Sequence, residues 1–286
     1  MKNLLKSDFY RARKDKVLFI GLMVTIGLVI FQLLITKALS SMAEGEVEGA
    51  GALLTTSGLS AWSNGVSVMG NTAQMIAPIF ITIFFVKEFN DRTIRNKLII
   101  GYSRSQIFYG IIIVHFVLSL IFLFAASFVG LIFGSLLFGL GATFNADVFG
   151  MIVIGFIIQF LLSYVLMGFC IIIAINKQSI ALGIVLPIAI GFIISLIGSF
   201  AILGLSEGFT KVVSFTNFYQ SLELQKMTSL SQLVSESIVE VSKGPDNYII
   251  YALPLTPLAR MMIITPIVII LELVVGYFRF KKIQFK

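Results

Sequence analysis

The sequence predicts an all-α integral membrane protein that forms one transmembrane domain over residues 1–286, with six transmembrane helices. Of its 286 residues, 58% are hydrophobic and 12% are charged, whereas about a quarter of the residues are charged in a typical soluble domain. The mean hydropathy is +1.01. The apolar residues fall in long uninterrupted blocks, which is the pattern of helices surrounded by lipid.

Six apolar segments are about long enough to cross a hydrocarbon core of about 30 Å at about 1.5 Å per helical residue. They are residues 17–35, 66–86, 107–130, 148–175, 180–203 and 261–278. The second segment is the weakest, because only residues 75–86 are densely apolar. It is kept as a span because an odd number of crossings would scatter the basic residues over both sides.

The basic residues predict the orientation. With six crossings, sixteen of the 21 Lys and Arg residues fall on one side with four acidic residues, and the other side has five basic and nine acidic residues. Basic residues gather in cytoplasmic loops. We therefore predict a multi-pass cell-membrane protein whose N- and C-termini both lie in the cytoplasm.

Residues 1–16 combine basic residues with an apolar stripe. Leu4, Leu5, Phe9 and Ala12 fall roughly on one helical face. A helix of this kind lies in the cytoplasmic interface with its apolar side toward the membrane and its basic side toward anionic headgroups, so membrane lipid is an expected partner. The alternative is an unstructured basic tail.

Two long segments are predicted on the outer side, residues 36–64 and 206–256. In the second, apolar residues recur at helical spacing from Leu230 to Val241, and Ser229 with Gln232 forms a plausible capping box. We predict an extracellular amphipathic helix here, between the fifth and sixth spans.

The chain lacks the residues that enzymes and nucleotide sites need. It has no Walker motif for ATP, its single histidine excludes a two-histidine metal site, and its single cysteine, Cys170, excludes an intramolecular disulfide. Basic residues flank apolar blocks and form no solvated basic domain. We expect no catalytic residue, cofactor or metal in this chain and no nucleic-acid partner.

Two ionisable residues lie within the predicted spans, His115 and Glu272. A carboxylate at this depth should face protein or water, because exposure to lipid is costly. We hypothesise that the two side chains approach each other or line the cytoplasmic end of a pathway. The alternative is that Glu272 snorkels or is neutral and hydrogen-bonded as part of ordinary packing.

Small residues recur every four positions at Ala126, Gly130 and Gly134. This spacing lets two helices approach closely. The pattern is consistent with packing within the chain and with a dimer contact.

The loop after the second span, residues 87–106, is long for a simple connection. It reads KEFNDRTIRNKLIIGYSRSQ, which is a charged start, an amphipathic stretch, a turn at Gly101 and a small polar restart. Phe89, Ile94, Leu98 and Ile99 are available as apolar anchors. These features indicate a docking segment for a soluble partner, and the alternative is a solvated basic loop.

Part of this loop resembles type-2 ABC exporter permeases. The run Glu88-Phe-Asn-Asp-Arg-Thr93, then Leu98, then Tyr102-Ser-Arg104 is similar to that family's pattern of an acid, a threonine five residues later, a leucine and a small-x-Arg triplet. The order of predicted elements is also similar over the whole chain. Arg92 stands where the family usually has glycine, and Tyr102 stands where it usually has proline.

The resemblance implies a permease subunit of an ATP-driven exporter. Two copies, a homodimer in the simplest case, would pair with two separate ATPase subunits that hold the ATP and Mg²⁺. Residues 87–106 would form the cytoplasmic coupling helix. The residues expected to contact the ATPase are Glu88, Phe89, Asp91, Arg92, Thr93, Arg95, Leu98 and Arg104.

The resemblance also implies an exported cargo such as an amphipathic or antimicrobial peptide or a hydrophobic compound, with resistance or immunity as the benefit. The 27 phenylalanines favour an apolar cargo over a sugar or an ion. Two other functions stay open. An ion-coupled secondary transporter would have only Glu272 to bind its ion, and a non-transporting membrane subunit would bind a partner and move nothing.

Overall fold

The computed structural model describes residues 1–43, 72–139, 146–182 and 257–283, together with Gly58 and the pairs 185–186, 189–190 and 192–193. All regular secondary structure in these residues is helical. The main helices are α1 (Lys2–Lys14), α2 (Lys16–Ala43), α4 (Thr72–Asn90), α5 (Thr93–Ile99), α6 (Arg104–Phe138), α7 (Ala146–Lys177) and α11 (Pro257–Lys281).

Five of the six predicted spans coincide with α2, α4, α6, α7 and α11. Most of the fifth predicted span, residues 180–203, and the whole amphipathic segment 206–256 lie outside the described residues. Three stretches within the described ranges are long and apolar enough to cross a membrane, Lys16–Ala38, Arg104–Phe138 and Ile263–Lys281, and Ser163–Ala174 is a shorter apolar helix. The all-α membrane class is confirmed there, and the number of six spans stays a prediction.

The first outer loop begins later than predicted. We expected it from residue 36, but α2 continues to Ala43. The Thr36 hydroxyl donates to the Gln32 carbonyl at 2.9 Å, and no glycine or proline lies between Thr36 and Gly45. Polar residues alone therefore did not end the helix.

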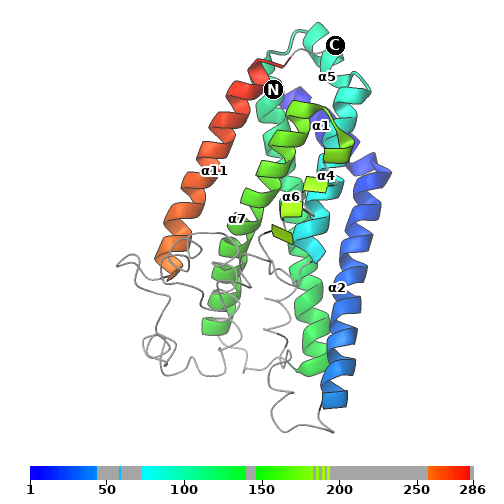
Figure 1. Cartoon of the computed structure of the whole chain (residues 1–286), viewed down its shortest axis with the longest axis vertical. Coiled ribbons are helices and arrows are strands. Elements are labelled where there is room, and N and C mark those ends of the chain that lie inside the picture. The colour runs from blue at the N-terminus through cyan, green and yellow to red at the C-terminus, as the bar shows by residue number, and fades with distance from the viewer. Residues whose placement is uncertain are drawn as a thin grey trace.

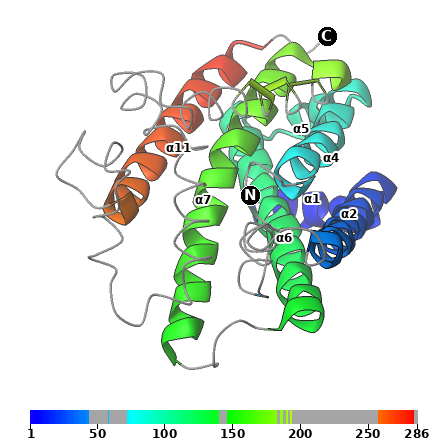
Figure 2. The same ribbon diagram turned by 60° about the horizontal axis from the view of Figure 1, so that its bottom comes forward.

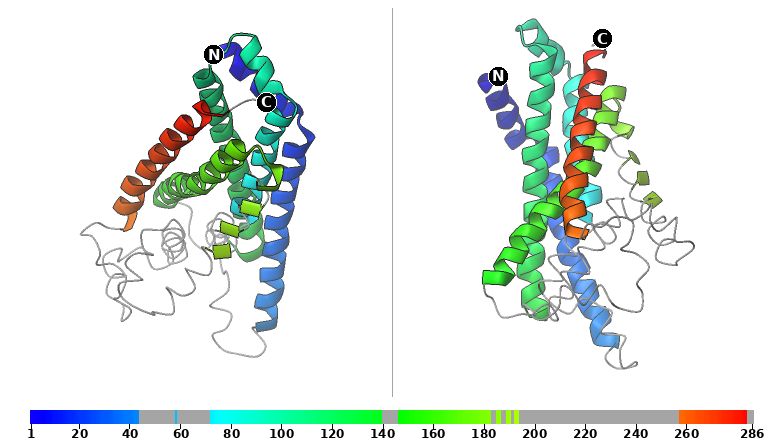
Figure 3. Two further views of the ribbon diagram at one scale, coloured as in Figure 1. Left: turned by 45° about the horizontal axis from the view of Figure 1, so that its top comes forward. Right: turned by 90° about the vertical axis from the view of Figure 1, so that its left-hand side faces the viewer.

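The helices form a bundle, and the short helices α1 and α5 lie together at one of its ends (Figure 1). α2 and α11 lie on opposite sides, with α4, α6 and α7 between them (Figures 1 and 2). α1 and α5 lie at the end of the bundle where α11 finishes, and the views in Figure 3 show the same grouping. The N-terminal segment, the predicted coupling segment and the C-terminal segment are therefore neighbours.

The core lies where α4, α6 and α7 meet. Its fully buried members include Ile81, Phe84, Phe85, Ile107, Ile111, Val114, Met167 and Ile171. Many large apolar side chains point outward instead, such as Phe19 on α2, Phe128 on α6 and Phe278 on α11, each more than half exposed. An apolar exterior of this extent is expected of a protein whose surroundings are lipid.

The small-residue stripe of α6 packs within the chain. Ala126 is fully buried in a cluster with Val29 and Leu33 of α2, and Gly130 and Gly134 are buried too. Ala126 therefore serves contact between α2 and α6, and the two glycines are buried within the same chain.

A second close approach joins α2 to α4 at Gly21. A Cβ atom at this position would lie 2.4 Å from the Cγ atom of Phe80, which is too short for any real contact. Gly27 lies further along the same helix, and a Cβ atom added there would have no other atom within 4 Å. The two glycines of one helix thus differ sharply in their surroundings.

We predict that Gly21→Ala lowers the free energy of unfolding by about 1–3 kcal/mol, because the added methyl group overpacks the contact with Phe80. Gly27→Ala is the matched control and should leave stability unchanged or slightly raised, since alanine favours the helix. Thermal unfolding of the purified proteins in mild detergent measures both. Equal midpoints for the two variants would contradict the close approach of α2 and α4.

Candidate functional site: a buried ion cluster under the coupling segment

Four charged side chains meet at the end of the bundle that holds α1 and α5. The ammonium group of Lys97 donates to Asp8 Oδ1 at 2.6 Å and to Glu88 Oε2 at 3.2 Å. The guanidinium of Arg11 forms an ion pair with Glu88. Asp8, Glu88 and Lys97 are 4%, 1% and 7% exposed. We call these four residues the ion cluster.

The cluster is electrically balanced, with two positive and two negative charges. This balance matters because an unpaired buried charge is strongly destabilising. Burial raises the pKa of the Glu88 carboxyl, and the positive charges of Lys97 and Arg11 act against that rise. The Arg11 guanidinium also lies over the Phe84 ring, 4.3 Å from its centroid, which adds a cation–π contact.

The cluster joins three helices that are separate in the sequence. Asp8 and Arg11 belong to α1, Glu88 lies in the last turn of α4, and Lys97 lies in α5. Ile94 of α5 is 1% exposed and extends the contact into the apolar core. α5 is therefore fixed on its inner face by a salt-bridged lysine and a buried isoleucine.

The turns on either side of α5 explain its position. Arg92 precedes the helix with φ +58°, in the left-handed region. Gly101 follows it with φ +102°. Ser103 then caps α6, since its hydroxyl accepts from the Gln106 amide at 3.2 Å and the Gln106 side chain accepts from the Ser103 amide at 3.0 Å. The predicted turn at Gly101 and polar restart are confirmed.

The left-handed conformation of Arg92 is one that favours glycine, the residue usual at this place in the permeases that the segment resembles. Glycine reaches positive φ at no steric cost, whereas other residues lose about 1–2 kcal/mol there. The family's usual glycine at this place fits the turn that the structure shows, and the chain forms the same turn with an arginine.

The eight residues expected at the ATPase fall into three groups by exposure. Asp91, Arg92, Arg95 and Arg104 are exposed, Phe89, Thr93 and Leu98 are half-buried, and Glu88 is buried. The carboxylate of Glu88 thus acts inside the chain, in the ion cluster. The outer surface also includes two large apolar side chains, Ile99 and Ile100, which are 75% and 74% exposed.

The downstream end of the segment is attached to α11. The Arg104 guanidinium donates to the carbonyl oxygens of Lys281 and Ile283 at 2.6 and 3.0 Å. The Ser105 and Tyr277 hydroxyls are 3.0 Å apart and share a hydrogen bond. Arg104, which we expected at the ATPase, therefore also holds the last helix.

α1 is a helix, so the alternative of an unstructured basic tail is wrong. Its apolar stripe faces the bundle, where Leu4 and Ala12 are buried. A Cβ atom on Gly110 of α6 would lie 3.3 Å from Leu4 Cδ2 and 3.7 Å from Asp8 Oδ2. The expectation that this apolar side faces the membrane is thus corrected for Leu4 and Ala12, and the place of α1 at the lipid interface stays a prediction.

Sequence reasoning missed Asp8, Arg11 and Lys97 as members of a site. One signal was present, because Asp8 lies on the same helical face as Leu4 and Ala12, at four-residue spacing. An acid on the apolar face of an otherwise basic helix is a candidate for a buried pair. The spacing could not show that its partner lies 89 residues away.

His115 and Glu272 lie inside the bundle but do not meet in a hydrogen bond or ion pair of the described structure. The His115 ring packs against those of Tyr164 and Phe85, with centroids 5.1 and 6.3 Å away, and its Nδ1 has no partner. Glu272 faces α7 instead, where its Oε2 would be 3.0 Å from a Cβ atom on Gly168. Among the residues that the structure describes, no group of three His, Cys, Asp or Glu side chains is arranged to hold a metal.

Residues 4–198 match the family described as ABC-2 family transporter protein. This range is more than half of the chain and includes the whole ion cluster and α5. The chain belongs to the ABC-2 transporter family. This ABC-2 protein is therefore a multi-pass membrane component of an ABC transporter. No curated protein and no solved structure matches it.

For this ABC-2 protein we predict that Lys97→Met destabilises the fold by about 3–5 kcal/mol, because Asp8 then stays buried without its partner. Lys282→Met, at an exposed lysine of the same end, is the matched control and should be nearly neutral. The double variant Asp8→Asn/Lys97→Met should recover part of the loss, since it restores charge balance. Thermal unfolding and the rate of tryptic cleavage within residues 1–16 provide the readouts. If the double variant lost as much stability as the sum of the two single variants, the result would argue against the ion cluster.

We predict that Arg92→Gly raises the free energy of unfolding by about 1 kcal/mol, because it relieves the left-handed conformation before α5. Arg92→Ala removes the same charge and keeps the strained φ, so it should bring no gain. Comparison of the two unfolding midpoints separates the effect of the backbone conformation on stability from the effect of the lost charge. A gain in Arg92→Ala equal to that in Arg92→Gly would show that charge is the cause.

Proposed function

We propose that this chain is the permease subunit of an ATP-driven exporter and that α5 is the coupling helix on which a separate ATPase subunit acts. The observation that carries this proposal is the two-sided character of α5. Its inner face is fixed by Lys97 and Ile94, and its outer side presents exposed charges and the exposed Ile99. A short helix with this division is suited to receive a partner and to pass its movement inward.

The proposed topology has six spans with both termini and α5 in the cytoplasm. In its favour, α1, α5 and the end of α11 lie together at one end of the bundle (Figures 1 and 3). These are the segments that carry most of the basic residues. Their grouping agrees with the preference of Lys and Arg for the cytoplasmic side.

In the proposed mechanism, ATP and Mg²⁺ bind to the ATPase and not to this chain. Closure of two ATPase subunits pushes the α5 helices of two permease copies. Because the ion cluster joins α5 to α1 and α4, these helices move with it. Because Arg104 holds the end of α11, the movement also reaches the last span.

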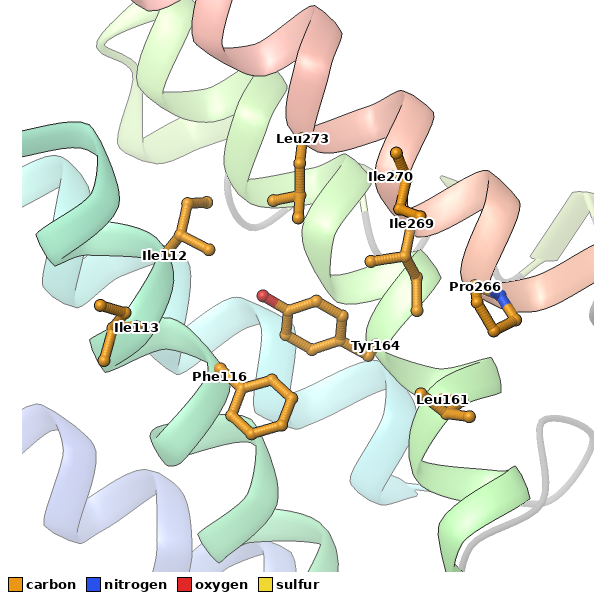
Figure 4. Close-up of a pocket in the computed structure, with 9 residues that line it drawn as sticks. All are labelled: Ile112, Ile113, Phe116, Leu161, Tyr164, Pro266, Ile269, Ile270 and Leu273. Atoms are coloured by element: carbon orange, nitrogen blue, oxygen red, sulfur yellow. The ribbon is translucent and has the colours of Figure 1, made fainter. Parts of the chain in front are cut away.

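The proposed cargo is an amphipathic or antimicrobial peptide or a hydrophobic compound. The supporting observation is a groove of about 360 Å³ between α6, α7 and α11, lined almost entirely by apolar side chains (Figure 4). This volume lies at the lower end of the range for small-molecule sites, about 300–1,000 Å³. The groove opens between helices, as expected for a site that a compound reaches from the lipid.

We predict that Arg95→Glu, which reverses an exposed charge on α5, reduces co-purification of the ATPase and stimulated ATP hydrolysis at least severalfold, with normal membrane insertion. Charges that face each other across an interface are complementary. Reversal of one of them removes an attraction and places two charges of the same sign opposite each other, and both effects weaken docking. Arg279→Glu reverses an exposed charge at the same end outside α5 and is the matched control.

Wild-type ATP hydrolysis in Arg95→Glu, or an equal loss in Arg279→Glu, would count against the coupling role of α5. Transport in whole cells separates the ion-coupled alternative. ATP depletion should stop transport, and dissipation of ion gradients at constant ATP should not.

A further inference from the structure

Glu272 occupies the contact between α7 and α11. Two glycines make this contact close. A Cβ atom on Gly276 would lie 2.9 Å from Ile172 Cδ1, and one on Gly168 would lie 3.0 Å from Glu272 Oε2. Any side chain at position 168 would take the space of the carboxylate, so the absence of a Cβ atom there leaves room for Glu272 between the helices.

The carboxylate lies beside the apolar groove. Leu273 and Ile269, its neighbour and the residue one turn before it, line the groove from α11. Tyr164 of α7 lies at its centre with the hydroxyl oxygen directed into the space between the helices (Figure 4). On α7, Gly168, against which the Glu272 carboxylate lies, follows Tyr164 by one helical turn. Glu272 itself is not one of the lining residues, but it lies next to the groove on both helices.

The Glu272 carboxyl group has no cationic partner among the residues that the structure describes. The ion pairs there belong to the ion cluster, and no basic side chain of the described ranges reaches Glu272. A carboxylate in the apolar part of a membrane protein is costly without such a partner. A cation brought by a ligand would supply the missing partner for its carboxylate form.

We propose that the groove and Glu272 together bind amphiphilic cations, molecules that combine an apolar body with one positively charged group. The apolar body lies along Ile113, Phe116 and Ile270, and the cationic group lies at Glu272. The Tyr164 ring lines the same space and offers its face to the cation. That such molecules are the exported cargo rests on the proposed function, whereas their binding does not.

The test measures binding to the full-length chain in nanodiscs of zwitterionic lipid, without ATPase or ATP. The probe is radiolabelled dodecyltrimethylammonium, and dodecanol is its uncharged counterpart. Wild-type protein should bind the cation, and Glu272→Gln should bind it about tenfold more weakly or worse with little change for dodecanol. Glu46→Gln, in the predicted outer segment, is the matched control and should bind as wild type does.

A second pair of variants keeps the test decisive if Glu272→Gln does not fold. Ile113→Trp fills the groove from α6, and Ile121→Trp places the same ring at an equally exposed position of that helix outside the groove. Ile113→Trp should weaken binding of both probes, and Ile121→Trp of neither.

Unchanged affinity for dodecyltrimethylammonium in Glu272→Gln or in Ile113→Trp overturns the inference, as does the absence of binding by the wild type. The outcome is independent of the coupling test. If Arg95→Glu kept full ATP hydrolysis while the cation still bound at Glu272, the export role would be wrong and the binding site would stand.

Discussion

The ion cluster is the constraint on which the end of the fold that holds α1 and α5 depends. Lys97 donates to two carboxylates at once, Asp8 and Glu88, and each comes from a different helix. A buried pair of this kind adds little net stability compared with apolar packing, but removal of one partner is expensive. The cluster therefore specifies position: α1, α4 and α5 fit together in the arrangement that brings its four charges into balance.

Apolar contacts around the cluster connect α5 and α1 to the core and to α4. Ile94 extends from α5 into the core, and Arg11 lies over Phe84 of α4. On the other side, the rings of Phe89 and Phe280 join the end of α4 to the end of α11. α5 is thus connected through the cluster and the core to several helices, as its proposed role in coupling requires.

Much of the fold could be predicted from the sequence, because lipid demands long apolar helices and leaves blocks that are easy to read. The segment with the proposed coupling role stands out in the sequence by its charge and length. The role of Glu88 could not, since exposed and buried charges look alike in a charged stretch and only a contact with Lys97 and Arg11 distinguishes them. Similar depth predicts that His115 and Glu272 are near each other, but depth does not fix the direction in which a helical residue points; His115 packs on Tyr164 and Glu272 lies against Gly168, one turn further along α7, and their pairing stays a hypothesis.

The hydrogen bonds of Arg104 have a consequence for the groove. The carbonyl groups at the end of a helix have no partners within it, and Arg104 at the start of α6 takes up those of Lys281 and Ile283. Gly276, five residues before Lys281, lies at a close approach of α11 to α7. Ile269, which lines the groove, lies on the N-terminal side of this approach. Arg104 and Gly276 thus hold α11 at and near its C-terminal end, and the residues with which α11 lines the groove, Pro266 to Leu273, all lie on the N-terminal side of both contacts.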